Sequence, residues 1–84
     1  MDVSTTGTTL AYPEIATIFA EVFHHTAPLT HATSPEDIRR WDSLQHLALV
    51  RALEKTFSIR LSMDEMMEIR SVGAIEALLQ RHSV

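Results

Sequence analysis

Apolar residues recur at helical spacing in three stretches of this chain, and this periodicity is the feature that most constrains its fold. The first stretch contains Ile15, Ile18, Phe19, Val22 and Phe23. The later two contain Leu47, Leu49, Val50, Leu53 and Phe57, and then Val72, Ile75, Leu78 and Leu79. Intervals of three and four residues place such side chains on one face of a helix. Nowhere do apolar and polar residues alternate over more than a few positions, so the sequence predicts an all-α fold.

Capping residues indicate where these helices begin. Pro13 suits the first position of a helix, because that position needs no amide donor. Ser62 and Glu65 have the spacing of a capping box. Ser71 can cap the last helix, whose first turn is weakened by Gly73. We therefore expect helices over residues 13–25, 43–57 and 72–82, and a short helix from 63 to about 69. The predicted fold is a small four-helix bundle with three main helices and one short helix.

A long connection separates the first two main helices. Helical periodicity stops over residues 26–40, where Pro28 and Pro35 interrupt the chain. A structureless loop of this length in a small domain is usually either functional or a sign that the elements are wrongly assigned. Three apolar side chains can attach it to the core, namely Leu29, Ile38 and Trp41. We therefore expect an ordered loop rather than a linker.

The length of 84 residues, 45% of them hydrophobic, allows one domain with a modest core. Residues 1–11 are rich in Thr and Ser, and we interpret them as a flexible N-terminal tail before a single domain over 12–84. Met1 and this tail favour a free-standing protein, which we expect to be a monomer. The sequence contains no membrane span and no signal peptide, so the expected location is the cytoplasm.

The chain has no cysteine, which excludes a disulfide, a thiolate nucleophile and a cysteine-zinc site. Any thiol chemistry would need a thiol from another molecule. The net charge of −4 disfavours nucleic acid as a partner. Five histidines are present, but their spacing fits no ligand pattern, so we expect no metal site.

The start of the second main helix carries the best candidate site. Asp42 is a good N-cap, and Gln45 three residues later can return a bond to the amide of the cap residue. Ser43 then occupies the first helical position, where free amides and the helix dipole favour a phosphate attached to its hydroxyl. The charge of Asp42 would repel a phosphodiester, which suggests a role in metal-assisted transfer or in capping. His46, one turn further on, could be a general base, but a partly buried polar role is favoured because no acidic partner orients it.

Several segments together resemble an acyl carrier protein, over residues 13–82. These segments are Asp42-Ser43-Leu44 after the long loop, Leu49-Val50-Arg51-Ala52-Leu53-Glu54 leading to Phe57, and Arg70-Ser71-Val72-Gly73-Ala74-Ile75. The resemblance implies that a phosphopantetheinyl transferase moves 4'-phosphopantetheine from coenzyme A onto Ser43. The thiol of that arm would hold acyl groups as thioesters, so the protein would be a carrier and not an enzyme. It also implies that Asp42 assists the transferase and its magnesium, and that Leu44 contacts partner enzymes.

The resemblance extends to the surfaces that acyl-loading and acyl-accepting enzymes would contact. Arg51 lies on nearly the same side of its helix as Leu44. Asp64, Glu65 and Glu68 are placed where carrier proteins present charge to partners. Compared with carriers of fatty acid synthesis, the second main helix is less acidic, which weighs against docking onto the basic patches of those enzymes. Arg40-Trp41 replaces the two glycines of peptidyl carriers, so the sequence looks more like discrete carriers of polyketide, extender-unit or other specialised acyl pathways.

Simpler interpretations exist for the same residues. Asp42 and Ser43 could form only a helix cap, in a small helical interaction module that binds a partner helix at Leu44 and has no prosthetic group. Trp41 is expected to anchor the loop. Met63, Met66 and Met67 could form a docking surface or fill the core, and core filling is favoured for at least one of them. Glu65, Glu68 and Glu76 are most simply solvated helix positions.

Overall fold

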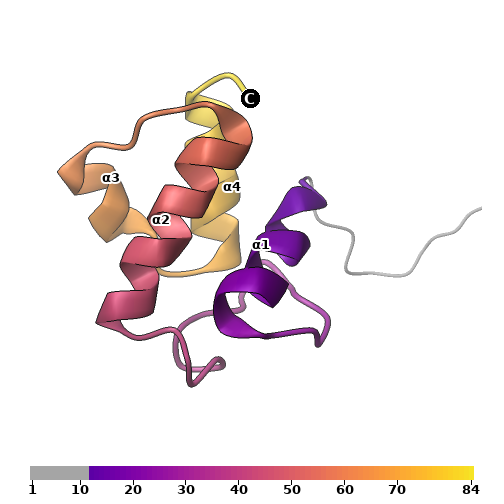
Figure 1. The fold of residues 1–84 in the computed structure, drawn as a ribbon. Helices are drawn as coiled ribbons and strands as arrows, with labels where there is room; N and C mark the ends of the chain where they lie inside the picture. The colour runs from indigo at the N-terminus through magenta and orange to yellow at the C-terminus, as the bar shows by residue number, and fades with distance from the viewer. Residues whose placement is uncertain (1–11) are drawn as a thin grey trace, which may run out of the picture.

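The computed structural model describes residues 12–84 and contains four helices. They are α1 (Glu14–Phe23), α2 (Ser43–Phe57), α3 (Met63–Glu68) and α4 (Val72–Arg81). Helix α1 packs along α2, α4 lies behind them, and the short α3 lies on the opposite side of α2 from α1 (Figure 1). The described part of the chain contains no strand. The predicted bundle of three main helices and one short helix is therefore confirmed, whereas the tail predicted over residues 1–11 lies outside the described residues.

The core is formed by the apolar faces of the three long helices. Ile15, Phe19, Leu49, Val72 and Ile75 are fully buried, each with a relative exposure of 0%. These residues come from α1, α2 and α4, so the spacing that predicted each helix also fixes the face that it buries. Tyr12, just before α1, contacts the C-terminus of the chain, because its hydroxyl donates to the Val84 carbonyl at 2.9 Å.

The helix boundaries are close to those predicted, with α1 shorter at both ends. Helix α2 spans the predicted residues, and Ser62 and Ser71 cap α3 and α4 as expected. Pro13 precedes α1 as its N-cap rather than opening the helix. The helix ends at Phe23, because His24 adopts a left-handed conformation with φ 54° and its amide returns to the Phe19 carbonyl.

The long connection between α1 and α2 is ordered, as predicted. Its three apolar side chains are buried at exposures of 4 to 5%: Leu29, Ile38 and Trp41. It is also bonded to the start of α4. The Val72 amide donates to the Thr33 carbonyl at 2.9 Å, and the Gly73 amide donates to the His31 carbonyl at 2.8 Å. The free amides of the α4 N-terminus thus hold the loop that leads to Ser43.

Two side chains do not lie where the sequence pattern placed them. Leu47, assigned to the apolar face of α2, is 54% exposed, because the core-facing side of the helix is filled by Leu49, Val50 and Leu53. Glu76, assigned to solvent, is only 4% exposed, and its carboxylate contacts the ring of His31 in the long loop. The carboxylate tolerates burial because it has polar partners there.

Candidate functional site

Ser43 is the first residue of α2, and its side chain is exposed. No hydrogen bond to its hydroxyl is found within residues 12–84. Asp42 caps the helix. Its backbone is extended, with φ −101° and ψ −176°, and its carboxylate accepts from the Gln45 amide at 2.9 Å. The hydroxyl therefore stands at the positive end of a capped helix, free to be esterified without displacing a core atom.

Trp41 fixes the backbone immediately before this cap. The indole is 4% exposed. It packs edge-on against Phe19 at 5.3 Å between ring centroids and stacks on Phe23 at 5.5 Å. The prediction that Trp41 anchors the loop is confirmed. Because Asp42 and Ser43 follow directly in the chain, the buried Trp41 ring fixes the position of the backbone that carries the Ser43 hydroxyl.

His46 connects the anchor to α3. Its Nδ1 accepts from the Trp41 indole Nε1 at 2.9 Å, and its Nε2 lies 2.9 Å from the Met66 carbonyl oxygen. An indole nitrogen only donates and a carbonyl oxygen only accepts, so the ring is neutral with its proton on Nε2. Both nitrogens are engaged, and His46 is therefore a structural residue rather than a general base for Ser43.

Gln45 connects the start of α2 to the end of α1. Its side-chain amide donates to the Val22 carbonyl at 2.9 Å. The Gln45 side chain therefore does not form the expected bond to the backbone amide of Asp42. It bonds to Val22 instead, because this carbonyl at the end of α1 lacks a helical partner and is close enough to accept. Only half of the predicted capping box is present, namely the bond from the Gln45 amide to Asp42.

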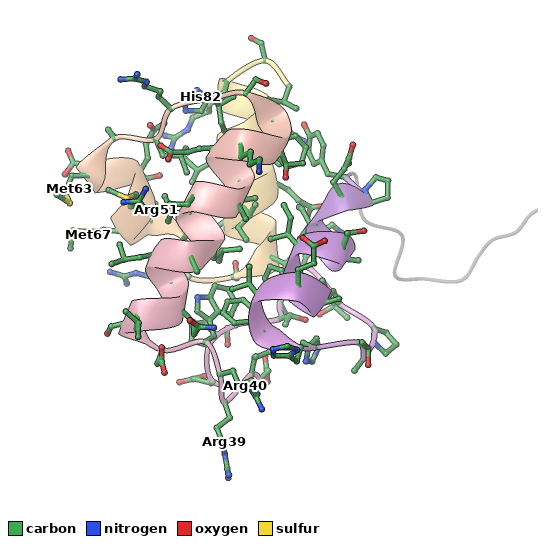
Figure 2. The ribbon with its side chains drawn as sticks, in the orientation of Figure 1. Arg39, Arg40, Arg51, Met63, Met67 and His82 are labelled. Carbon is green, nitrogen blue, oxygen red and sulfur yellow. The ribbon has the colours of Figure 1, made fainter. Side chains whose placement is uncertain are left out.

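The predicted partner contacts on α2 are exposed. Leu44 is 74% exposed and Arg51 is also at the surface. On α3, Met63 and Met67 point outward at 69% and 66% exposure, and only Met66 packs against the core (Figure 2). The preference for core filling thus holds for one of the three methionines. Apolar side chains therefore cover part of the surface on both helices.

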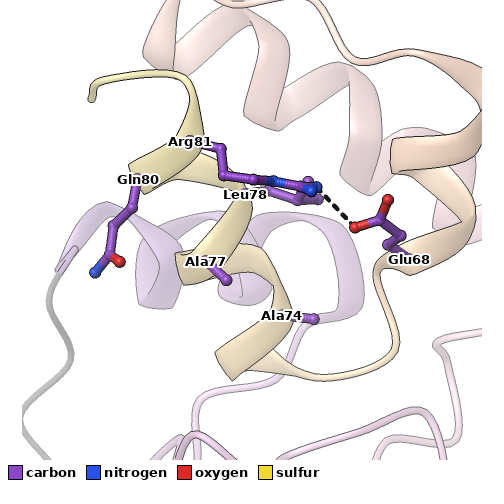
Figure 3. Close-up of a pocket in the computed structure, with 6 residues that line it drawn as sticks. All are labelled: Glu68, Ala74, Ala77, Leu78, Gln80 and Arg81. Carbon is purple, nitrogen blue, oxygen red and sulfur yellow. Dashed lines mark hydrogen bonds and ion pairs between the residues drawn. The ribbon is translucent and has the colours of Figure 1, made fainter.

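The acidic residues of α3 differ in their contacts. Asp64 is exposed, and its carboxylate forms no hydrogen bond or ion pair with another described residue. Glu68 accepts from Arg81 at 2.7 Å, across a shallow hollow between α3 and α4 (Figure 3). Glu65 contacts His82 at 2.9 Å and accepts from the Ser62 amide. That backbone bond lowers the pKa of the Glu65 carboxyl below its usual value, and His82 acts in the same direction.

Comparison with known proteins identifies the family and the fold of this chain. The family described as phosphopantetheine attachment site matches residues 13–79, a range that includes Ser43. The structure is similar to the solution structure of the holo acyl carrier protein from Geobacter metallireducens, at 33% sequence identity and a TM-score of 0.74, covering 81% of this chain and 79% of that one. The chain belongs to the acyl carrier protein family. No curated protein matches it.

Membership in this family fixes the general chemistry. An acyl carrier protein is a carrier rather than an enzyme, and it works with a covalently attached phosphopantetheine. The exposed Ser43 hydroxyl fits such a group, and the group supplies the thiol that a chain without cysteine lacks. Within residues 12–84, no three potential ligand side chains gather as a metal site requires. Over the same range, no helix has the length and apolar character to cross a bilayer.

The sequence indicated Ser43 as the candidate attachment residue but not the contacts that hold it. Asp42 and Ser43 are recognisable because helix capping is a local signal. The contacts of Gln45 with Val22 and of His46 with Trp41 and Met66 depend on how separate elements pack. The one available signal for them was the polar character of two residues in the first turn of α2.

Proposed function

We propose that Ser43 carries 4'-phosphopantetheine and that the protein transports acyl groups as thioesters on the thiol of this arm. One observation supports this assignment above the others: Ser43 offers an exposed hydroxyl that no described residue binds, at the capped start of α2 and inside the matched family region. On transfer, this hydroxyl gives up its proton and its oxygen attacks the coenzyme A phosphate that bears the pantetheine arm. The pyrophosphate P–O bond breaks, adenosine 3',5'-bisphosphate leaves, and the arm remains on Ser43 as a phosphodiester. The Asp42 carboxylate, adjacent to Ser43, is placed to assist a phosphopantetheinyl transferase and its magnesium.

The surface around Ser43 supports recognition by partner enzymes. Leu44 is the exposed apolar side chain next to the attachment point, and Arg51 lies two turns further along α2. Asp64, Glu65 and Glu68 add carboxylates on α3. We propose that acyl-loading and acyl-accepting enzymes contact these residues and Asp42. The exposed α2 face with Arg51 and Lys55 favours partners in a polyketide, extender-unit or other specialised acyl pathway, and the protein acts as a cytoplasmic monomer.

Mass spectrometry tests the assignment of Ser43. The purified protein is incubated with coenzyme A, magnesium and a promiscuous phosphopantetheinyl transferase, and its intact mass is measured. We expect the native protein to gain the mass of one phosphopantetheine group and Ser43→Ala to gain nothing. Ser34→Ala, which changes a serine of the long loop, should gain the same mass as the native protein. Absence of modification on the native protein would favour the helical interaction module instead, and modification of Ser43→Ala would place the arm on another residue.

A further inference from the structure

A surface groove follows the C-terminal half of α2 and the connection to α3. A hollow of about 580 Å³ is lined by Arg51, Glu54, Lys55, Ile59, Arg60 and Leu61. An adjoining hollow extends it between α2 and α3, where it is lined by Leu47, Val50, Arg51, Glu54, Leu61 and Met66. The two hollows share Arg51, Glu54 and Leu61, so together they form one surface, here called the α2 groove. Figure 2 shows Arg51 on the side of α2 that carries α3.

The α2 groove is cationic in a protein whose net charge is −4. Arg51, Lys55 and Arg60 are all exposed, and none of them forms an ion pair with another residue of the described part of the chain. Arg51 and Lys55 are four residues apart and lie on one face of α2. The carboxylate in the groove, Glu54, already accepts from the Leu61 amide at 2.9 Å. The groove therefore presents three cations with unused hydrogen-bond donors.

The same face continues as an apolar surface toward Ser43. Leu44 and Leu47 precede Arg51 by seven and four residues, so these side chains share a stripe along α2. Both leucines are more than half exposed, at 74% and 54%. Neighbouring exposed leucines beside cations that have no ion pair within the described residues form a mixed apolar and charged surface, which a partner of complementary character can cover. The stripe ends next to the exposed hydroxyl.

We propose that the α2 groove is a docking surface for a partner enzyme that presents apolar side chains flanked by carboxylates. This inference rests on the proposed function, because it specifies the partner of an acyl carrier that is loaded at Ser43. Apolar side chains of the partner contact Leu44 and Leu47, and separate carboxylates pair with Arg51, Lys55 and Arg60. Such charge complementarity steers encounter and fixes the register of docking.

The arrangement of the groove favours a protein surface over a small anion such as phosphate. The three cations come from different positions around an open hollow, and the Leu61 amide that could bind phosphate is occupied by Glu54. The Glu54 charge also repels a compact, multiply charged ion held at the centre. Carboxylates spaced along a protein surface can each reach one cation without meeting Glu54.

Charge variants of the carrier test this proposal. Native protein, Arg51→Gln/Lys55→Gln/Arg60→Gln and Arg51→Glu/Lys55→Glu/Arg60→Glu are first converted to the phosphopantetheinylated form. They are then mixed with clarified extract of the source cells, ATP, coenzyme A and acyl-coenzyme A, and the initial rate of acylation is measured by intact mass. Matched controls carry the same changes at Arg39, Arg40 and Arg70, which are exposed cations that do not line the groove. Figure 2 shows Arg39 and Arg40 away from Arg51. Circular dichroism checks that each variant is folded.

We expect neutralisation of the groove to slow acylation about tenfold, and charge reversal to slow it further, because each lost pair is partly exposed and individually weak. Added salt should slow the native protein more than the neutralised variant. The controls should stay within about twofold of the native rate. Faster acylation of the reversed variant, unchanged rates, or an equal loss in the controls would overturn the proposal. Failure of the native protein to accept phosphopantetheine would instead refute the function assigned to Ser43, before any rate is measured.

Discussion

At the scale of single residues, Asp42 has two separable roles, as a helix cap and as a charge beside Ser43. Its carboxylate accepts from the Gln45 amide at 2.9 Å. We expect Asp42→Ala to lower the free energy of unfolding by about 1 kcal/mol, because the first turn of α2 loses its cap. Asp42→Asn keeps a side-chain oxygen for the same bond, so it should lie within a few tenths of a kcal/mol of the native protein. Urea denaturation measures both values.

The two Asp42 variants also separate capping from the transfer reaction. If the charge assists the transferase, Asp42→Asn is stable but receives phosphopantetheine more slowly than the native protein. Equal modification rates for Asp42→Asn and the native protein would restrict Asp42 to its role as a cap. Unchanged stability of Asp42→Ala would show that the cap bond adds little to the fold.

The residues after Ser43 show how far the sequence could predict this site. The Asp42 cap and the exposure of Leu44 follow from local rules of helix initiation and periodicity. The partners of Gln45 and His46 lie 23 and 20 residues away, at the Val22 and Met66 carbonyls. Such partners are decided by the packing of one helix against another, which periodicity does not specify. The site was therefore predictable as a position, and its supporting contacts were not.

At the scale of elements, α3 is attached by Met66, which packs against the core, and by polar contacts with the end of α4. No residue of α3 is fully buried, although Leu61 and Ile69 on either side of it are buried. Its capping box was predictable from Ser62 and Glu65, because both partners lie within one turn. Its contacts with Arg81 and His82 join it to the end of α4, and no local pattern indicated them. The short helix was therefore predictable, but its attachment was not.

We expect Glu65 to make stability depend on pH in the acid range. The Ser62 amide, assisted by His82, holds the pKa of Glu65 below its usual value of 4.5. A carboxyl whose pKa is lower in the folded state stabilises the fold above its unfolded pKa, and this contribution is lost as pH falls through the folded pKa. Glu65→Gln should therefore lose less stability than the native protein as pH falls below 4.5. Thermal unfolding between neutral and acid pH measures this.

The exposed loop residue Glu36 supplies the control for this titration. Glu36→Gln should follow the native pH profile, since no bond to Glu36 is found within the described residues. Parallel profiles for Glu65→Gln and the native protein would assign the acid sensitivity to other groups.

Gly73 illustrates an element whose sequence is set by a neighbouring segment. A Cβ at this position would meet the His31 carbonyl oxygen at 3.0 Å, and that oxygen already accepts from the Gly73 amide. Alanine is the better helix former by about 1 kcal/mol. We nevertheless expect Gly73→Ala to destabilise the protein, because a backbone carbonyl of the loop must move. Urea denaturation against Ala77→Gly, an exposed position of the same helix, gives the reference for helix propensity alone. A gain of stability in Gly73→Ala would show that the loop yields freely at this contact.

At the scale of the whole molecule, the long loop is held against the helices by buried apolar side chains and by contacts with α4. Its apolar anchors were predictable from the sequence because they interrupt a polar segment: Leu29, Ile38 and Trp41. The contact of Glu76 with His31 was not, since a glutamate in a surface-type helix pattern is ordinarily solvated. Burial of this carboxylate follows from the loop covering α4, which only the assembled fold reveals.

His46 is the point at which the loop, α2 and α3 meet, so its removal tests how the whole molecule holds Ser43 in place. His46→Ala leaves the Trp41 indole N–H and the Met66 carbonyl without their partner and removes a stacked ring at 6.3 Å. We expect a loss of about 2 kcal/mol in the free energy of unfolding. Trp41→Phe removes the same indole donor from the other side, so the double variant should cost less than the sum of the two single variants, by about 0.5 to 3 kcal/mol. Strict additivity in urea denaturation would show that the two side chains act independently. Leu44→Ala, exposed in the same turn, should change stability by no more than about 0.5 kcal/mol.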